Sequence, residues 1–493
     1  AASASTPLME DGFGPDFKEK TRTYAGCSAL PDFLLQAFVL LPLWAFLVLP
    51  IMLIYLAVMA IVRMCVKGPK KIKPFKDVDL SLPTDALGAA DRPYDFILMG
   101  ATGFTGNLAA EYIAVTYGAK KYKWAICGRS QNKLEIVKKR LVELNSEMAA
   151  LDIVLANSLD SKQTDRVAKQ AKLVMSTVGP FAKYGTPLVI SCARYGTHYV
   201  DITGEIGWVR HVIENLDKTA RTTGARIVSC CGQDSVPWDI VTFAAAEAFK
   251  KRGDNLVDIR IFEEFKGSAS GGTISTLFTS FQSPLARTKS GFNPMEMDAK
   301  GSRSLFSTKA ILPKLCYSYN PEIKQYVAPF VMAPVNSNVV RRSNALLGYA
   351  KKLKYVEVET HSGCMAAFLS VLQTIWFASA IFFPPFKTIM MCFLPDPGQG
   401  PTREQMREGY LKVTAIGRSE KMEKAIVKLG FTVDPAYEDT ARMMVECGLC
   451  SLDESANKEA KSGVLSPMAA FGSLLVERLQ ANGRGIFFSV SMQ

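Results

Sequence analysis

The segment from Tyr94 to Gly106 constrains the fold of this 493-residue chain more than any other part of the sequence. A short apolar run, Phe96 to Met99, leads directly into three glycines at intervals of three residues: Gly100, Gly103 and Gly106. An amphipathic stretch, Asn107 to Tyr117, follows them. This order predicts a buried strand, a tight turn and a helix.

A strand, a glycine-rich turn and a helix in this order are typical of a dinucleotide-binding site. Glycine lets backbone amides approach a phosphate closely, and the start of a helix offers unpaired N–H groups and the positive end of the helix dipole. We therefore expect the turn to bind a pyrophosphate through seven residues: Gly100, Ala101, Thr102, Gly103, Phe104, Thr105 and Gly106.

A second apolar run, Trp124 to Cys127, ends at Gly128, Arg129 and Ser130. In NAD-binding sites an acidic side chain near this point binds the ribose 2′-hydroxyl. Here Arg129 and Ser130 occupy the place, and the planar guanidinium of arginine pairs well with phosphate oxygens. The sequence thus predicts NADP(H) in preference to NAD(H). The alternative is that Arg129 only follows the strand and meets solvent.

Strand and helix patterns continue to alternate along the chain. Four further strands are expected at Asp152–Leu155, Leu173–Ser176, His198–Asp201 and Arg226–Ser229. Helices are expected between the strands at Gln131–Ala149, Thr164–Lys169, Pro187–Tyr195 and Trp208–Thr222. Thr186, just before a proline, is the expected cap of the third of these helices. Strands separated by such helices predict a parallel, doubly wound sheet.

In a sheet of this kind the ligand lies across the carboxyl ends of the strands. Asn157 and Ser158 follow the third strand and would flank the adenine of a dinucleotide. The residues after the fourth strand would line its nicotinamide end: Val178, Gly179, Pro180 and Phe181.

The pattern changes after Val257. The runs Asp258–Phe265 and Val356–Glu359 alternate like partly exposed strands, so a Rossmann-type domain at 93–255 is expected to precede a second α+β domain at 256–411. The segment 412–493 is expected to complete the fold with helices at Pro435–Gly448 and Pro467–Gln480 and a strand at Ile486–Val490.

Leu34 to Val62 is a run of 29 residues without a charged side chain. About 20 apolar residues suffice to cross a bilayer, so we expect a transmembrane helix at 33–65, kinked at Pro42 and Pro50, between an N-terminal arm at 1–32 and a basic linker at 66–92. A buried core helix is the alternative. Because basic residues follow the run, the positive-inside rule places the main body on the stroma, matrix or cytosol side of a single-pass anchor.

A second apolar run, Met365 to Phe383, stops at Pro384 and Pro385. A full span, a re-entrant or interfacial helix and a buried core helix all fit its composition. A single crossing here is disfavoured, because the chain from Gly400 onward must rejoin the body.

Composition bears on localisation and partners. The Ala- and Ser-rich start is typical of a chain from which an organelle transit peptide was removed, although trimming would leave the same start. We expect an organelle membrane, a plastid ahead of a mitochondrion. The net charge of +12 includes six basic residues just after the anchor, which suit anionic lipid headgroups. No basic motif interleaved with aromatic residues indicates a nucleic-acid partner.

Cys447 and Cys450 form a lone C-x-x-C pair among eleven cysteines. Zinc would need two more ligands, and the chain has only three histidines, so no metal site is expected. The pair is expected at the end of a helix, where the helix dipole opposes a thiolate. A redox function is therefore disfavoured.

Five segments occur here in an order and spacing that mark one known family: 100–106, 127–130, 178–185, 199–205 and 231–239. With the later segments 339–342, 400–402, 435–437 and 463–467, they resemble the saccharopine dehydrogenase-like oxidoreductases. That group includes mycobacterial trans-acting enoyl reductases and an animal lipid-droplet member. The resemblance runs from about Arg92 to the C-terminus and implies an oxidoreductase without naming its reaction. An apolar stretch at this place in the family is thought to touch lipid, which favours a membrane contact by 364–394.

Catalytic residues are predicted from their place in the expected fold. Five side chains fall in or near the loops around the nicotinamide: Tyr184, His198, Asp201, Glu205 and Asp234. Tyr184 is the preferred proton donor. The other four have structural alternatives, since His198 could orient a strand end, Asp201 and Glu205 could cap the following helix, and Asp234 could hold a turn.

Two functions follow as hypotheses. The first is a membrane-anchored NADPH-dependent oxidoreductase acting on an apolar or lipidic small molecule, with an enoyl-type reduction among the reactions it would fit. The alternative is an accessory subunit of a larger membrane complex that retains a bound NADP(H). Saccharopine oxidoreduction itself would require a cluster of buried arginines, and Arg341 with Arg342 is little support for one.

Overall fold

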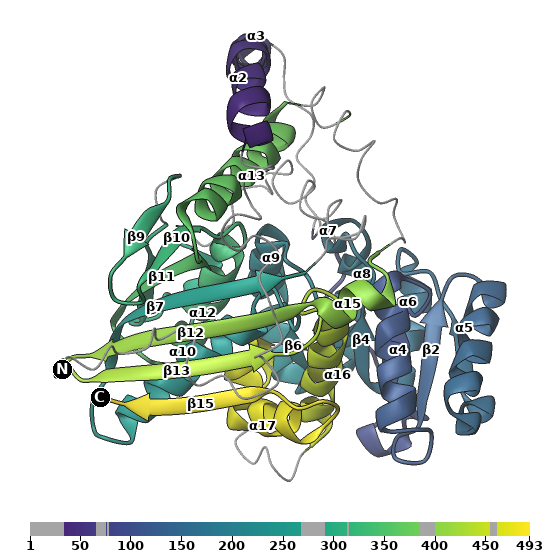
Figure 1. Cartoon of the computed structure of the whole chain (residues 1–493). Coiled ribbons are helices and arrows are strands. Elements are labelled where there is room, and N and C mark those ends of the chain that lie inside the picture. The colour runs from purple at the N-terminus through teal and green to yellow at the C-terminus, as the bar shows by residue number, and fades with distance from the viewer. Residues whose placement is uncertain are drawn as a thin grey trace.

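The computed structural model describes residues 34–65, 75, 78–267, 291–312, 315–383, 388, 400–453 and 461–493, without the side chains of residues 60–65, 381 and 382. Two sheets form the body, and a pair of apolar helices projects from it (Figure 1). The expected N-terminal arm at 1–32 and the start of the expected linker at 66–92 lie outside the described residues.

The first sheet has seven parallel strands in the order β14-β6-β5-β4-β1-β2-β3. They are β1 (Tyr94–Met99), β2 (Trp124–Gly128), β3 (Asp152–Leu155), β4 (Ala171–Ser176), β5 (His198–Asp201), β6 (Arg226–Val228) and β14 (Gly463–Leu465). The six strands predicted from the sequence are confirmed, with small shifts at their ends. The seventh, β14, comes from the C-terminal segment, and the sequence pattern did not indicate it.

Helices cover both faces of this sheet. They are α4 (Phe104–Thr116), α5 (Gln131–Leu144) and α16 (Glu438–Leu452) on one face and α6 (Ser161–Gln170), α8 (Thr186–Tyr195) and α9 (Ile206–Thr223) on the other. Successive side chains of a strand point to opposite faces. Accordingly, Phe96 and Leu98 of β1 lie in one hydrophobic core, and Ile97 and Met99 lie in the other.

The predicted capping role of Thr186 is wrong. Gly185 is the cap residue of α8, and Thr186 lies inside the helix, where its hydroxyl accepts a hydrogen bond from the indole N–H of Trp208 (3.0 Å). The Thr186 side chain thus joins α8 to α9 instead of closing the end of its own helix.

The second sheet is mixed and has eight strands, in the order β15-β13-β12-β7-β11-β10-β9, with β8 also paired to β11. They are β7 (Leu256–Lys266), β8 (Ser307–Ala310), β9 (Ser318–Asn320), β10 (Gln325–Pro329), β11 (Lys352–His361), β12 (Tyr410–Ser419), β13 (Lys424–Phe431) and β15 (Phe487–Met492). Against it pack α10 (Val236–Lys250) and α12 (Ala333–Leu347), and α17 (Pro467–Ala481) packs on α10. Both strands predicted for this part of the chain are confirmed within β7 and β11.

The C-terminal segment contributes to both sheets. β12, β13 and β15 belong to the second sheet, whereas α16 packs on β4 and β5 and β14 extends the first sheet (Figure 1). α16 continues four residues beyond the predicted end at Gly448, to Leu452, and Cys447 and Cys450 lie in its last two turns, as expected. Both thiols are buried inside it. Within the described residues no group of three or more His, Cys, Asp or Glu could hold a metal ion.

The N-terminal apolar run forms a projecting helix. Within the described ranges one helix, Gln36–Met59, is long and apolar enough to cross a membrane, by length and composition only. Wide π-helical turns, η3 (Gln36–Leu40) and η4 (Trp44–Val48), alternate with α2 (Leu41–Leu43) and α3 (Leu49–Cys65). Each π turn precedes one of the two prolines, whose rings lack the N–H of a regular helix.

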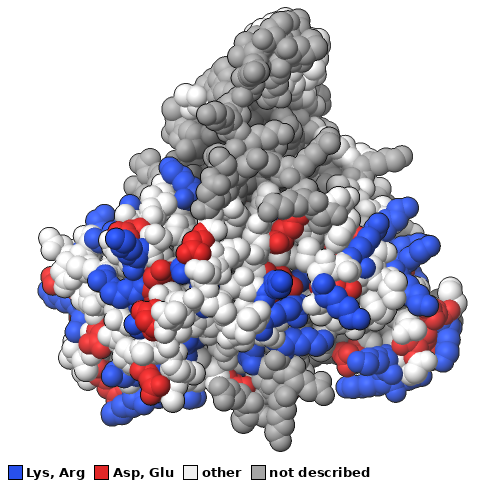
Figure 2. Space-filling view, turned by 180° about the vertical axis from the view of Figure 1, so that it is seen from behind, with Lys and Arg blue, Asp and Glu red and all other residues white. Residues whose placement is uncertain are grey.

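The side chains of this helix face outward, and Phe38 and Phe46 are 69% and 84% exposed. The back of the body differs, because lysine, arginine and acidic side chains are interspersed over it (Figure 2).

The second apolar helix, α13 (Cys364–Phe382), runs from the body to the first (Figure 1). Its first half packs on β10 and β11, where Ala367 and Leu372 are buried. Toward its other end, the Ser379 hydroxyl accepts a hydrogen bond from the indole N–H of Trp44 (3.1 Å), and the Trp44 and Trp376 rings meet edge to face. The first half of α13 is therefore a core helix, and the second half joins the body to the projecting helix.

One buried arginine connects the two sheets. Arg342 of α12 is 1% exposed and donates hydrogen bonds to the carbonyl oxygens of Met297 and of Val464 in β14, the latter at 2.6 Å. Its guanidinium also lies 3.6 Å from the Asp217 carboxylate of α9. Because protein groups already surround this guanidinium, Arg342 ties α12 to the first sheet and is not a substrate ligand.

Replacing Arg342 by Met should lower the free energy of unfolding by about 3 kcal/mol, because hydrogen bonds from a charged donor to buried acceptors are lost. Chemical denaturation of the purified chain in mild detergent measures this change. The control Arg252→Met removes a surface ion pair with Glu423 (3.1 Å) and should cost less than about 1 kcal/mol. Equal losses in both variants would contradict this account of Arg342.

Candidate functional site

The turn between β1 and α4 is built from close backbone contacts. Gly100 has φ +94°, a conformation that residues with a Cβ rarely adopt. A Cβ on Gly106 would lie 2.2 Å from the Gly100 carbonyl oxygen, and a Cβ on Gly100 would lie 2.7 Å from the Thr177 hydroxyl. Only glycine therefore allows the first turn of α4 to pass so close to the end of β1.

The start of α4 fits a phosphate group. Gly103 is its cap residue, and no side chain accepts a hydrogen bond there. The N–H groups of the first helical turn therefore remain for a ligand, at the positive end of the helix dipole. The Phe104 side chain is not part of this surface, because its ring packs edge to face on Tyr437 with centroids 5.2 Å apart. Gly400 lies against the same ring.

The predicted adenine-side residues lie at the carboxyl ends of β2 and β3. Arg129 is exposed directly after β2, and the Ser130 hydroxyl accepts a hydrogen bond from the backbone N–H of Lys133, which caps α5. After β3, the backbone N–H of Asn157 donates to Gln163 (2.9 Å), and Ser158 is buried. These residues share one edge of the sheet with the glycine turn.

The predicted nicotinamide-side loop is held by Glu205. The Glu205 carboxylate accepts hydrogen bonds from the backbone N–H groups of Phe181 and Ala182, at the start of α7 (Phe181–Tyr184). The predicted alternative for Glu205 was a cap on the following helix, and Glu205 is the N-cap residue of α9 (Ile206–Thr223), but its side chain caps α7 instead. Burial raises the pKa of the Glu205 carboxyl group. Glu205 thus positions the loop that contains Val178 and the cis peptide between Gly179 and Pro180.

Two other predicted residues have structural roles. Asp201 accepts hydrogen bonds from the Ser229 hydroxyl (3.0 Å) and the backbone N–H of Thr203 (3.0 Å), which joins the ends of β5 and β6. His198 is the first residue of β5 and so lies at the opposite edge of the sheet, where its Nδ1 accepts the backbone N–H of Arg226 (3.2 Å). Placing His198 near the nicotinamide was wrong.

A cavity of about 220 Å³ opens beside the glycine turn. On the side of the first sheet it is lined by Thr105 of α4, by Ile202 after β5, and by Gly232, Gln233 and Asp234 after β6. The opposite wall comes from the second domain and the C-terminal segment: Phe265, Gly267, Phe330, Val331, Met332, Ala436, Tyr437 and Thr440. The cavity therefore lies at the carboxyl edge of the first sheet, the edge at which doubly wound sheets bind ligands.

Among the described residues that line this cavity, Asp234 has the one carboxyl group. Its carboxyl oxygen would lie 3.8 Å from a Cβ on Gly204. Burial raises the pKa of Asp234 to about 6. Among the described residues no hydrogen bond or ion pair is formed by the Asp234 side chain.

Tyr184, the predicted proton donor, does not line the cavity. It ends the short helix α7, and the Lys183 ammonium lies 4.9 Å from its ring centroid. Sequence reasoning missed the far wall of the cavity. The segment 435–437 was noticed as a motif, but nothing in it indicated that Ala436 and Tyr437 would face the glycine turn across two domains.

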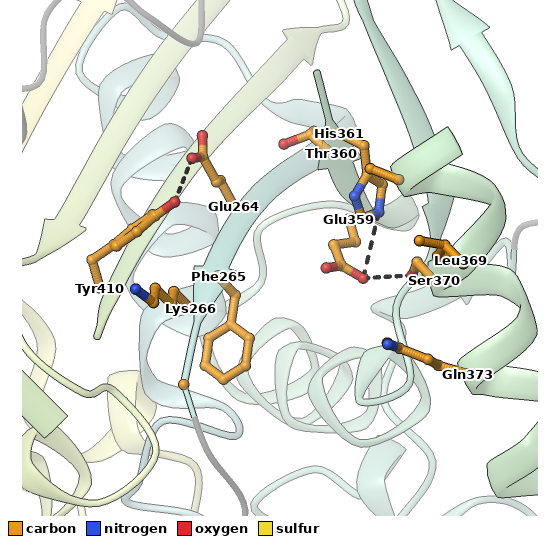
Figure 3. A pocket seen from close by; sticks show the side chains of 12 residues that line it. Glu264, Phe265, Lys266, Glu359, Thr360, His361, Leu369, Ser370, Gln373 and Tyr410 are labelled. Atoms are coloured by element: carbon orange, nitrogen blue, oxygen red, sulfur yellow. Dashed lines mark hydrogen bonds and ion pairs between the residues drawn. The ribbon is translucent and has the colours of Figure 1, made fainter. Parts of the chain in front are cut away.

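A second cavity, of about 260 Å³, lies at the carboxyl ends of β7 and β11 beneath the first turns of α13 (Figure 3). Its wall is more polar than that of the first. Glu264 accepts a hydrogen bond from the Tyr410 hydroxyl (2.7 Å), and Glu359 accepts one from the Ser370 hydroxyl (2.9 Å). The two cavities share Phe265 and Gly267.

Comparison with known proteins agrees with this geometry. Residues 96–228 match the family model of the saccharopine dehydrogenase NADP binding domain. A Mycobacterium tuberculosis protein, provisionally named a trans-acting enoyl reductase, is 34% identical over 413 residues, which cover 80% of this chain and 97% of that protein. A trans-acting enoyl reductase of Mycobacterium bovis is 31% identical over 419 residues, covering 80% of this chain and 98% of the relative.

The fold also resembles that of a solved enzyme. The apo saccharopine dehydrogenase (L-Glu forming) of Saccharomyces cerevisiae superposes with a TM-score of 0.50 at 9% identity, over 81% of this chain and all of that one. This likeness confirms the fold, and the match to the NADP binding domain supports a nicotinamide cofactor. The chain belongs to the saccharopine dehydrogenase-like family of NAD(P)-binding oxidoreductases.

Proposed function

We propose that this chain is a membrane-bound, NADP(H)-dependent reductase of an apolar substrate. The observation that carries the proposal is the cavity beside the glycine turn, which has mainly apolar walls from two domains and one carboxyl group, that of Asp234. Cavities with apolar walls and few polar groups are typical of small-molecule sites.

The residues of the glycine turn would bind the diphosphate, and Arg129 with Ser130 would bind the 2′-phosphate. NADPH supplies a hydride when it is bound in such a site. Glu205 holds the loop of Gly179 and Pro180 in place through the backbone of Phe181. Phe330 and Met332 line the substrate side of the cavity and would keep water from it.

Asp234 replaces Tyr184 as our proposed proton donor. A reduction by hydride transfer also needs one proton. Asp234 lines the cavity and can supply that proton, whereas Tyr184 does not line the cavity. Because burial raises its pKa to about 6, a larger part of the enzyme holds the proton near neutral pH than an exposed aspartate would allow.

Membrane attachment is part of the proposal. The projecting helix Gln36–Met59 is apolar and exposed, and its contact with α13 links it to the second domain. A bilayer would cover these side chains, and a substrate dissolved in that bilayer would reach the body beside α13. The names of the mycobacterial relatives support reduction of a carbon–carbon double bond.

The function is tested with the full chain purified in mild detergent. We expect it to oxidise NADPH with an α,β-unsaturated long-chain lipid and to yield the saturated product, detected by mass spectrometry. If the chain is instead recovered in a stoichiometric assembly with a bound nucleotide that no substrate oxidises, it is an accessory subunit and the proposal fails.

Replacing Arg129 by Ala should weaken NADPH binding by about 10–100-fold, because charge-assisted hydrogen bonds contribute about 1.5–3 kcal/mol. NADH lacks the 2′-phosphate, so its affinity should change little. Fluorescence titration with both nucleotides measures the effect, and Lys139→Ala, an exposed residue of α5, is the control. Equal losses for NADPH and NADH would refute the assignment.

The rate should depend on pH through Asp234. Because the pKa is raised to about 6, the protonated acid predominates below that value, and kcat/KM should fall as pH rises above it. Asp234→Asn should lower kcat by about 10²–10⁴-fold and remove this pH dependence, with NADPH binding retained. An unchanged pH profile in the variant would show that another group supplies the proton.

A further inference from the structure

Gln233 lies in the loop after β6 and lines the cavity beside the glycine turn, next to Asp234. It is only 5% exposed, and among the described residues no group forms a hydrogen bond with its carboxamide. A side-chain amide carries N–H donors and a carbonyl acceptor, and buried polar groups in folded proteins are nearly always hydrogen-bonded. An enclosed carboxamide in a mainly apolar cavity is therefore suited to a polar group of a ligand.

The other uncharged polar side chains in the described wall of this cavity already have places of their own. The Thr440 hydroxyl donates a hydrogen bond to the carbonyl oxygen of Pro435 (3.0 Å). Thr105 belongs to the glycine turn, where we expect the diphosphate, and the Tyr437 ring packs on the aromatic side chain at the start of α4. Gln233 thus offers the amide donors of this wall.

The loop that contains Gln233 is held on two sides. The backbone N–H of Gln233 donates to the Thr440 hydroxyl of α16 (3.0 Å). On the other side, the N–H of Cys230 donates to the Asp201 carboxylate (3.3 Å), and the N–H of Cys231 donates to the Asp201 carbonyl oxygen (2.7 Å). Cys230 has φ +64°, which is uncommon for a residue with a side chain. The carboxamide therefore extends from a loop whose backbone is fixed before a ligand binds.

A carbonyl oxygen beside the reducible bond is the group that needs such a donor. When a hydride adds to a carbon–carbon double bond, the displaced electron pair must be taken up, and the oxygen of a conjugated carbonyl can take it. Hydrogen-bond donors that are held in place at such an oxygen stabilise the charge that develops there, and asparagine and glutamine side chains serve this purpose in enzymes.

We propose that the Gln233 carboxamide donates a hydrogen bond to the carbonyl oxygen of the substrate, and that the reducible double bond is conjugated to this carbonyl. The substrate class is thus an α,β-unsaturated ketone, ester or thioester. This inference rests on the proposed reductase function and names its substrate class.

The atoms and electrons of this reaction balance. The β-carbon of the substrate accepts a hydride from NADPH, which becomes NADP⁺, and the electron pair of the double bond moves toward the carbonyl oxygen, where Gln233 binds it. The α-carbon then takes the proton of Asp234 and the carbonyl re-forms. Asp234 is left as a carboxylate, which regains a proton from water. Gln233 and Asp234, neighbours in one loop, thus act on adjoining parts of one molecule.

The first test uses two long-chain methyl esters, one with its double bond conjugated to the ester and one with its double bond in the middle of the chain. With the full chain in mild detergent, we expect NADPH to be consumed with the conjugated ester only, because the other double bond has no carbonyl oxygen to take up its electron pair. Equal rates with both esters would overturn the proposal.

Replacing Gln233 by Met removes the amide donors and keeps the length of the side chain. We expect kcat with the conjugated ester to fall by about 10²–10³-fold, the usual effect of losing one such donor, with NADPH affinity and the pH dependence through Asp234 retained. Gln480→Met, on the exposed surface of α17, is the matched control and should change neither. An unchanged kcat contradicts the proposal, and so does a loss of NADPH affinity in a variant that circular dichroism shows to be folded, because the carboxamide would then bind the nicotinamide.

Infrared spectroscopy of a bound saturated methyl ester with a ¹³C-labelled carbonyl does not depend on turnover. A hydrogen bond to the oxygen lowers the carbonyl stretching wavenumber, so we expect a lower value in the unchanged chain than in hexane and a higher value in Gln233→Met. Gln233→Leu, which also lacks the N–H groups, replaces this variant if it does not fold.

The two proposals can fail separately. If no ester is reduced but the wavenumber shift is present and depends on Gln233, the reductase proposal fails and the carbonyl site stands. If the conjugated ester is reduced and the bound carbonyl absorbs as in hexane, the role of Gln233 is wrong and the reductase stands. A saturated ester that does not bind at all also overturns the carbonyl site.

Discussion

The contact between Gly106 and the carbonyl oxygen of Gly100 is the constraint on which the site depends. Since a side chain at Gly106 would collide with that oxygen, the first turn of α4 can lie against the end of β1 only with glycine. That position brings the open end of the helix to the carboxyl edge of the sheet. It also fixes the position of the Phe104 ring, which packs against Tyr437 and Gly400. The same turn therefore contacts the C-terminal segment.

The C-terminal segment explains why the cavity has walls from two domains. α16 is buried on the first sheet, and β14 adds a strand beside β6. The part of the chain that comes after β13 of the second sheet therefore returns to the first sheet. Arg342 reinforces this return through the carbonyl of Val464. The same chain segment therefore ties the second domain to the first sheet, and Met332 and Asp234 line one cavity from the two sides.

Much of the first sheet could be predicted because its strands are short apolar runs ended by glycine or polar residues. β14 could not, since a three-residue strand pairs with β6 only after the chain has passed through the second sheet. The misplacement of His198 was avoidable: the first residue of a parallel strand lies at the edge away from the ligand. The role of Glu205 was harder to foresee, because its partner amides precede it in the chain.

The far wall of the cavity follows from tertiary packing alone. Phe330 and Met332 lie between β10 and α12, and neither carries a sequence signal that differs from ordinary core residues. Arg129 and Asn157 lie at the carboxyl ends of β2 and β3, and their assignments to the 2′-phosphate and the adenine remain predictions.

α13 contacts both the cavity at the ends of β7 and β11 and the projecting apolar helix. Ser370 faces the polar cavity and Ser379 meets Trp44, and a separation of nine positions corresponds to about two and a half helical turns. The two serines therefore lie on opposite sides of α13. The helix stands between the cavity and the projecting helix, so one helix forms a wall of the cavity and also holds the projecting helix through Trp44.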